Sequence, residues 1–340
     1  MRALRTGKIP SDILIRNVFP YMGKKDPSLL LGSSIGEDAA LVSLGNNVLV
    51  LKTDPVTGTT SDIGWLAVHI NANDIACRGA TPRWFLCDLL LPKQSNVAMI
   101  DAIMRQVDEA AREIGVAVAG GHTEVTPGLK RPIIVGCMIG VTRKKQYVTS
   151  NGARAGDVII MTKSVGIEGT SILATDYARK LRNKSGPRLL ARAKSFGRMI
   201  SVVDDALSAV DAGGVHAMHD PTEGGLLQGI WELAEASRVG FRIHEASIDI
   251  RPETKQICSI LRVNPLRLLS SGCLLIAADK RRSEGILKRL KARGISGKVI
   301  GAFTPKKMGR KLVGIDGTMT EIGASERDEL YGVMDRFGRD

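Results

Sequence analysis

Aromatic side chains are scarce in this sequence: Phe, Tyr and Trp together make up 4% of the 340 residues. The hydrophobic core must therefore be built mainly from Ile, Leu, Val and Ala. The formal net charge of the sequence is +13, which favours anionic partners. Because no aromatic residues interleave with the spread-out Lys and Arg residues, the charge alone does not favour nucleic-acid binding.

Cysteine is scarce as well. The five cysteines form no C-x-x-C pair, which argues against a disulfide framework and against a typical zinc motif. We interpret them as small apolar residues of the core. The sequence also has no run of about 18 apolar residues and no apolar signal core at its N-terminus. It therefore predicts no membrane association and a location in the reducing cytoplasm.

The standard short motifs of nucleotide and hydrolase sites are missing. The sequence contains no G-x-x-x-x-G-K-[ST], no G-x-G-x-x-G, no G-x-S-x-G and no H-E-x-x-H. If the protein binds a nucleotide, the site must therefore be of another kind.

The rest of the composition is that of an ordinary globular protein, with 44% hydrophobic and 24% charged residues. Its length corresponds to about two domains. A polar stretch with a Gly-containing turn, Tyr147–Asp157, marks the predicted boundary, which gives domains 1–150 and 151–340. Strands and helices mix without strict alternation, so the sequence predicts two α+β domains rather than one doubly wound sheet.

The clearest predicted element is an amphipathic helix over residues 96–114, whose apolar residues recur at 3.6-residue spacing. Strands are expected in the first domain over residues 48–52, 84–91, 116–119 and 133–141. A Gly-rich polar turn is expected to separate the last two. Helices are expected in the second domain over residues 170–181, 202–210, 222–237, 253–261 and 281–293. Strands are expected there over residues 158–161, 215–218, 241–244, 273–277 and 299–303.

Three carboxylates stand next to apolar segments: Asp38 in GEDAALV, Asp54 at the end of the strand VLVLKTD, and Asp74 inside a predicted helix. Asp74 follows Ile63 by eleven residues, which returns it to within about 20° of the same apolar helix face. A buried carboxylate is costly unless it is paired or bound to a cation. The three groups could converge on Mg²⁺, which prefers carboxylates, water and substrate phosphates. The alternative is that each is an ordinary turn or capping residue.

A second candidate region follows the strand expected at residues 116–119. The paired glycines Gly120 and Gly121 would allow backbone N–H groups to approach a phosphate closely. His122, Thr123 and Glu124 follow at once, and these side chains can handle a proton or a metal ion. The alternative is a glycine-rich hairpin with polar decoration.

A third candidate region is the stretch HDPTEGGLL at the start of a predicted helix. Thr222 is a suitable N-cap residue, and Gly224 and Gly225 lie in the first turn. Glycines there are unfavourable for the helix but permit the close approach of an anion to its positive end. The alternative is a flexible helix start.

Together these segments resemble the superfamily of aminoimidazole ribonucleotide synthetase, the PurM-related superfamily. IGEDAALV is similar to its G-[DE]-D-A segment, and LKTDPVTG to its T-D strand end. DIGWLAVHINANDIACRGATPRW is similar to the signature that contains N-D-[IL]-A-x-x-G-A-x-P. HDPTEGGLLQGIWELAEAS is similar to the D-x-T-[ER]-G-G-L helix start of the second domain. The four segments occur in the family's order, and the resemblance covers nearly the whole chain.

The resemblance implies a two-domain PurM-like α+β fold, in which the sheets of two first domains pair in a homodimer. It implies a site for ATP and Mg²⁺ in the first domain and phosphoryl transfer to a carbonyl, amide or phosphate oxygen of the substrate. The metal-binding residues would then be Asp38, Asp54 and Asp74. The residues implied in binding the nucleotide or another anion are Asp38, Asp54, Asn73, Gly120, Gly121, Thr123, Thr222, Gly224 and Gly225. The residues implied in catalysis are Asp74, His122 and Glu124.

Within the superfamily, the segments are most similar to HypE, the hydrogenase-maturation protein, whose C-terminal cysteine carries a carboxamide that is dehydrated to a nitrile. This sequence ends in DRFGRD, and its last cysteine is Cys273, so we do not expect that reaction in the known form. HypE also has Asp where this chain has His122, so the acidic role is expected to pass to Glu124.

The sequence thus predicts an ATP- and Mg²⁺-dependent enzyme whose substrate is a small molecule or is carried by a protein. One alternative is a nucleotide-binding, HypE-like scaffold that serves a maturation partner. Another is a kinase of the thiamine-monophosphate type. Nucleic-acid binding is the least favoured hypothesis.

Overall fold

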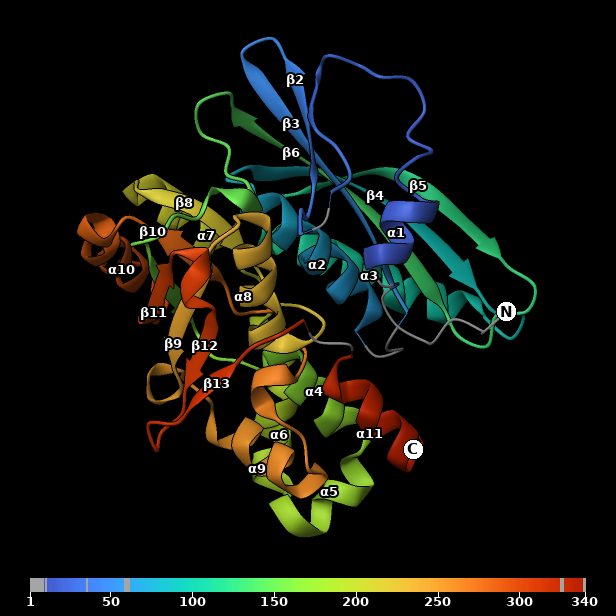
Figure 1. Ribbon diagram of the computed structural model, residues 1–340. Coiled ribbons are helices and arrows are strands. Elements are labelled where there is room, and N and C mark those ends of the chain that lie inside the picture. The colour runs from blue at the N-terminus through green and yellow to red at the C-terminus, as the bar shows by residue number, and fades with distance from the viewer. Residues whose placement is uncertain (1–8, 10, 35, 58–61, 325–326, 339–340) are drawn as a thin grey trace. The chain divides into compact units, whose positions relative to one another are not determined.

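The computed structural model describes residues 9, 11–34, 36–57, 62–324 and 327–338. These residues form two compact units (Figure 1). The small unit consists of Ser28–Gly32 and Asp38–Tyr147. The large unit consists of the described residues up to Pro27, of Ser33–Glu37 and of the chain from Val148 onward. The domain ranges 1–150 and 151–340 remain a prediction.

The small unit contains a six-stranded sheet with the order β1-β2-β3-β6-β4-β5. Its strands are β1 (Leu29–Leu31), β2 (Ala40–Leu44), β3 (Asn47–Val56), β4 (Thr81–Leu91), β5 (Ala117–Val125) and β6 (Ile133–Arg143). Neighbouring strands are antiparallel except for β4 and β5, which are parallel. In β6, each residue buried against the helices alternates with a half-buried one, so the two faces of the sheet differ.

Two helices cover one face of this sheet (Figure 1). Helix α2 (Ile63–Cys77) packs on β3, β6 and β4, and helix α3 (Val97–Glu113) packs on α2. The side chain of Asn96 caps α3 by accepting a hydrogen bond from the Met99 N–H at 2.9 Å. The amphipathic helix predicted over residues 96–114 is therefore confirmed.

Strand β5 corrects one prediction. The strand expected over residues 116–119 continues to Val125, so Gly120 and Gly121 lie inside an edge strand and not in a turn. Gly121 pairs with Cys87 of β4 so closely that a Cβ on Gly121 would collide with the Cys87 carbonyl oxygen. Its φ of 145° also belongs to a region that glycine favours. Gly121 therefore has a packing reason that spacing alone does not reveal, whereas a Cβ on Gly120 would meet nothing within 4 Å.

The large unit contains a seven-stranded sheet with the order β13-β12-β9-β11-β7-β10-β8. Its strands are β7 (Val158–Thr162), β8 (Val215–His219), β9 (Gly240–His244), β10 (Leu275–Ala278), β11 (Gly297–Thr304), β12 (Arg310–Val313) and β13 (Met319–Glu321). The pairing is antiparallel except between β12 and β9. The five strands expected here from sequence are present, whereas β12 and β13 were not foreseen.

The helices of the large unit are α1 (Ser11–Asn17), α4 (Ile167–Asp176), α5 (Ala178–Ser185), α6 (Pro187–Ser195), α7 (Val203–Ala212), α8 (Gly225–Ala236), α9 (Pro252–Leu261), α10 (Ser283–Ala292) and α11 (Glu329–Phe337). Some of them contribute to two hydrophobic cores. One core joins α8 to the sheet, and the other lies among α4, α5, α6, α9 and α11. The helix expected over residues 170–181 is wrong in extent, because it is interrupted at Tyr177 and forms α4 and α5.

The predicted α+β class is confirmed in both units. Among the described residues, none of the helices combines the length and the apolar composition that a membrane crossing requires.

Candidate functional site

Helix α2 is enclosed on nearly all sides. All its residues are buried except Ile70, which is half-buried. Asp74 is 4% exposed, which confirms that this mid-helix carboxylate is buried. Asp74 is buried because the sheet covers one side of α2 and α3 covers another, so more than a single face of the helix is enclosed.

Lys52 of β3 lies between two of the predicted ligand carboxylates. Its Nζ lies 2.8 Å from Asp74 Oδ2 and 3.3 Å from Asp54 Oδ2. Because alternate residues of a strand share a face, Lys52 and Asp54 both point to the side of the sheet that α2 covers. Burial lowers the pKa of Lys52, but the attraction of Asp74, Asp54 and Asp38 outweighs it and raises this pKa. Lys52 is therefore a permanent cation in the cluster.

For the Asp74 carboxyl, the effect of burial on the pKa outweighs the effect of the neighbouring cation. Burial is the strongest influence and raises its pKa, and the negative charges of Asp38 and Asp54 act in the same direction. The Lys52 ammonium opposes them but does not cancel them. A carboxyl in this position is ionised only with the help of a nearby cation.

Asp38 is joined to the cluster through a second buried cation. Arg78, at the C-terminal end of α2, is fully buried, and its Nη2 donates to Asp38 Oδ2 at 2.9 Å. An isolated buried guanidinium would be very costly. The pair therefore fixes the position of Asp38 relative to α2.

Asn71 holds the backbone of Asp54 in place. Its Oδ1 accepts from the Asp54 N–H at 2.9 Å, and its Nδ2 donates to the Asp54 carbonyl at 3.3 Å and to the Ala67 carbonyl at 2.9 Å. A Cβ on Gly136 of β6 would come within 2.5 Å of Asn71 Nδ2, so only glycine leaves room for this amide. Asn73 is also fully buried, and its predicted role in cofactor binding remains a prediction.

Asp54 and the predicted glycine region lie in one row of paired residues across the sheet. Asp54 pairs with Gly136, Gly136 with Cys87, and Cys87 with Gly121. At about 4.8 Å per strand, Asp54 and Gly121 are roughly 14 Å apart. The sheet therefore places both predicted regions on one line but does not bring them into contact.

The side chains that follow Gly121 are exposed. His122 Nε2 lies 3.3 Å from Glu124 Oε2, and the Thr126 hydroxyl donates to Glu124 Oε1 at 2.7 Å. The Thr126 hydrogen bond, followed by that of His122, lowers the pKa of Glu124. Glu124 is thus an ionised surface carboxylate, better suited to a cation than to a proton at neutral pH. Thr123 lies in the same exposed strand.

The predicted anion site at the start of α8 is arranged differently from expectation. The prediction that Thr222 is the N-cap is wrong, because Gly224 occupies that position and the Thr222 carbonyl accepts from the Gly225 N–H at 3.1 Å. The Gly224 N–H donates to Asp328 Oδ2 at 2.7 Å. A Cβ on Gly225 would lie 2.6 Å from the Leu268 carbonyl oxygen. Backbone packing thus accounts for the second glycine, and a carboxylate of the chain itself occupies the N–H of the first.

Four residues of the small-unit cluster escaped the sequence reasoning. Lys52, Asn71, Arg78 and Gly136 all contact a predicted ligand or its support. Lys52 stands two residues before Asp54, and this strand alternation was the available signal. Nothing in the sequence pairs Gly136 with Asn71, because that contact depends on how β6 packs against α2.

The donor set of this cluster suits a hard divalent cation. Carboxylate oxygens are the preferred protein ligands of Mg²⁺, and Asp38, Asp54 and Asp74 supply them. Asp54 is the most accessible of the three, with a side chain that is 39% exposed. Metal binding by these three residues remains a prediction.

Comparison with known proteins identifies both parts of the chain. Residues 36–142 match the family model of the AIR synthase related protein, N-terminal domain, and residues 154–313 match that of the C-terminal domain. A Methanocaldococcus jannaschii protein, named for hydrogenase expression and formation, is 29% identical over 286 residues, which are 80% of this chain and 81% of the relative. The carbamoyl dehydratase HypE of Escherichia coli is 28% identical over 281 residues, 82% and 80% of the two chains.

Solved structures show the same fold. HypE in a complex with HypF superposes with a TM-score of 0.74 at 23% identity, covering 92% of this chain and 99% of that one. HypE in complex with ATP gives a TM-score of 0.72 at 24% identity, covering 96% and 97%. Since the two family models together span most of its length, the chain belongs to the AIR synthase-related (PurM-like) protein family.

Proposed function

We propose that this protein is an ATP- and Mg²⁺-dependent enzyme that transfers a phosphoryl group to a carbonyl, amide or phosphate oxygen of its substrate. The observation that carries the proposal is the partly buried cluster of Asp38, Asp54 and Asp74 in a domain of this family. The ATP complex of HypE, a protein of the same fold, supports the choice of nucleotide.

In this reaction the substrate oxygen attacks the γ-phosphorus, the bond to the β–γ bridging oxygen breaks, and ADP leaves. Mg²⁺ held by Asp38, Asp54 and Asp74 would supply neutralisation of the phosphate charge. Such transfers depend mainly on positioning and on electrostatic stabilisation. The Asn71 clamp on Asp54 and the Arg78 contact with Asp38 supply the positioning.

Lys52 gives the cluster a fixed positive charge. Its ammonium holds Asp74 at 2.8 Å, so the carboxylates are oriented before any ligand arrives. Groups oriented in advance need no reorganisation during the reaction. His122 is our candidate for accepting a substrate proton, because it is exposed on the same sheet and Glu124 Oε2, 3.3 Å from its Nε2, can orient the ring.

The name of the E. coli relative, carbamoyl dehydratase, suggests a related substrate group for this protein. The cysteines of this chain are poor carriers for such a group. Cys77 is fully buried, and burial raises the pKa of Cys87 to about 11 and that of Cys258 to about 12. Burial also raises the pKa of Cys137 and Cys273. We infer that the activated oxygen belongs to a small molecule or to a group on another protein.

The second candidate function is that of a scaffold, which would bind a nucleotide and a maturation partner protein. The HypE–HypF complex provides the supporting observation, because that protein of the same fold assembles with a second one. Capture of a specific protein by this chain without nucleotide turnover would favour the scaffold.

We also propose a homodimer formed through the small-unit sheet. The residues of β6 that alternate with those facing α2 are apolar and half-buried: Ile133, Val135, Cys137, Ile139 and Val141. The outer strand β5 exposes all nine of its residues. Exposed sheet edges and apolar sheet faces are normally covered. Light scattering should show a dimer, and Ile139→Glu should shift it to a monomer.

The test of the enzymatic proposal is ATP binding by calorimetry, with and without Mg²⁺, followed by ATP turnover with candidate substrates. Asp54→Asn and Asp74→Asn should each abolish Mg²⁺-dependent binding, whereas the exposed control Asp101→Asn should retain it. Full ATP turnover in both site variants would refute the proposal. Thiamine monophosphate belongs in the substrate panel, because product from it would identify the kinase alternative.

A further inference from the structure

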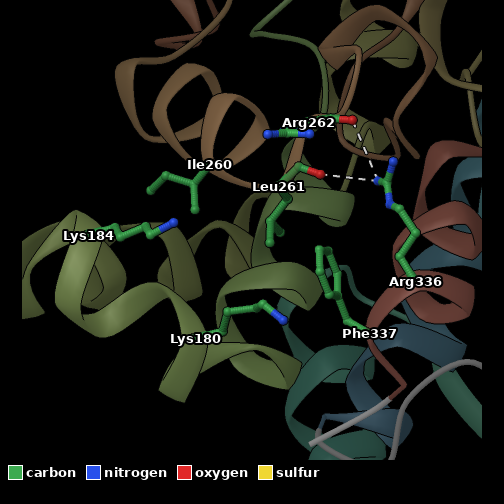
Figure 2. A pocket seen from close by; sticks show the side chains of 7 residues that line it. All are labelled: Lys180, Lys184, Ile260, Leu261, Arg262, Arg336 and Phe337. Carbon is green, nitrogen blue, oxygen red and sulfur yellow. Dashed lines mark hydrogen bonds between the residues drawn. The ribbon is translucent and has the colours of Figure 1, made fainter.

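A pocket of about 440 Å³ opens in the large unit between α5, the C-terminal end of α9 and the C-terminal end of α11 (Figure 2). Its lining residues are Lys180, Lys184, Ile260, Leu261, Arg262, Arg336 and Phe337. This volume is at the small end of the range for ligand sites, which is about 300–1,000 Å³. The pocket shares no residue with the acidic cluster of the small unit.

The charge around this pocket is of one sign. Four of the seven lining residues are Lys or Arg, and none is a carboxylate. The negative end of α9 also borders the pocket, but Arg336 Nη2 donates to the Leu261 carbonyl at 3.1 Å and to the Arg262 carbonyl at 3.5 Å. Arg336 therefore satisfies the helix end, and Lys184 and Arg262 are the basic side chains that can attract an anion.

The pocket also has an apolar wall. Ile260, Leu261 and Phe337 supply it, and Figure 2 shows the Phe337 ring pointing into the space between the basic side chains. The Lys180 ammonium lies 3.5 Å from the centroid of that ring. A ligand that fits both parts combines an anionic group with a compact apolar or aromatic body.

Arg262 has a backbone conformation that glycine usually adopts. It ends α9 with φ 54° and ψ 57°, in the left-handed region where a helix most often has Gly or Asn. Its positive charge suits the negative end of the helix, but its backbone conformation is less favourable for arginine than for glycine. In Figure 2 the Arg262 side chain borders the pocket, where its charge can reach an anion.

We propose that this pocket binds a small organic phosphate, with the phosphoryl group on Lys184 and Arg262 and an aromatic or apolar body against Phe337. Guanidinium and ammonium groups are the usual protein partners of phosphate. The inference stands independently of the proposed phosphoryl transfer, since it uses only residues of the large unit.

The probe is 1-naphthyl phosphate, titrated by calorimetry into the full chain. Inorganic phosphate tests the anionic part alone, and 1-naphthol tests the apolar part alone. We expect 1:1 binding of naphthyl phosphate that weakens as NaCl is raised, at least about tenfold weaker binding of phosphate, and no binding of 1-naphthol.

Arg262→Gly separates ligand binding from structure. Glycine suits the left-handed conformation, so the variant should melt at or above the wild-type Tm while binding naphthyl phosphate about tenfold more weakly. Arg238→Gly is the matched control. Arg238 follows α8, is exposed and has φ 55°, so this variant loses the same charge at the same kind of position. It should bind the probe as the wild type does. Lys184→Gln should weaken binding like Arg262→Gly.

Equal weakening by Arg238→Gly and Arg262→Gly would mean attraction to a generally basic surface and would overturn the proposal. Equal affinity for 1-naphthol would do the same, because the pocket would then be only apolar. Binding of hexaglutamate with the same dependence on Arg262, without binding of naphthyl phosphate, would assign the pocket to an acidic peptide instead.

Discussion

Replacement of Lys52 by methionine tests the central feature of the small unit, a cation held between carboxylates. Methionine keeps the length and apolar stem of the side chain and removes its charge, which leaves Asp74 buried without its partner at 2.8 Å. Breaking a fully buried pair costs about 3–5 kcal/mol. Because Lys52 is 19% exposed and Asp54 is 39% exposed, we expect a loss of about 2–3 kcal/mol, or roughly 3–4 °C in Tm for a chain of this length.

The assay is thermal unfolding at neutral pH, without MgCl₂ and with about 10 mM MgCl₂, which is on the order of the concentration that saturates a weak Mg²⁺ site. Mg²⁺ should raise the Tm of Lys52→Met more than that of the wild type, because a divalent cation can replace the missing ammonium. Lys52→Arg, which keeps the charge, should lose less, and Lys93→Met should lose nothing because Lys93 is exposed. A Tm of Lys52→Met within about 1 °C of the wild type would refute the reasoning. An equal Mg²⁺ effect on both proteins would refute it as well.

Three further results are expected. Gly136→Ala should lower stability by about 2 kcal/mol in urea titrations and weaken Mg²⁺-dependent nucleotide binding, because the new Cβ would displace Asn71. Burial raises the pKa of Asp328 to about 7, so the folded state holds a proton that the unfolded chain releases. The stability contribution of this group is then lost as pH rises from about 4 to about 7, and Asp328→Asn should flatten the measured pH dependence. Native protein at pH 8 should react slowly with a disulfide reagent, because the pKa of Cys87 is about 11 and that of Cys258 about 12, and urea should release full reactivity.

The sequence was informative wherever one segment decides the structure alone. The amphipathic period over residues 96–114 depends on neighbouring turns of one helix, and α3 forms there. The burial of Asp74 followed from its position among apolar residues of α2. The four segments that resemble the PurM-related superfamily led to the correct family and α+β class.

Features that depend on contacts between distant segments were not predictable in this way. The sequence predicts that Gly121 lies in a turn, yet its conformation is imposed by the approach of β4 at Cys87. The start of α8 reads as an open anion site, yet the Gly224 N–H already binds Asp328, which lies 104 residues later. Neither partner can be chosen from spacing, because many residues of the right chemistry compete and only the packed chain selects one.

The charge balance of the small-unit cluster explains why its cations matter for the proposed reaction. When ionised, Asp38, Asp54 and Asp74 together with Lys52 and Arg78 carry one net negative charge. In the proposed reaction this charge would repel free ATP, whereas one bound Mg²⁺ would reverse the sign and favour binding of the nucleotide. Without Lys52 the net charge would fall by one, so Mg²⁺ alone would bind more tightly while the complex of Mg²⁺ and ATP would bind more weakly. The opposite directions of these two effects follow from electrostatics. A lysine that served only to stabilise the fold would not separate them.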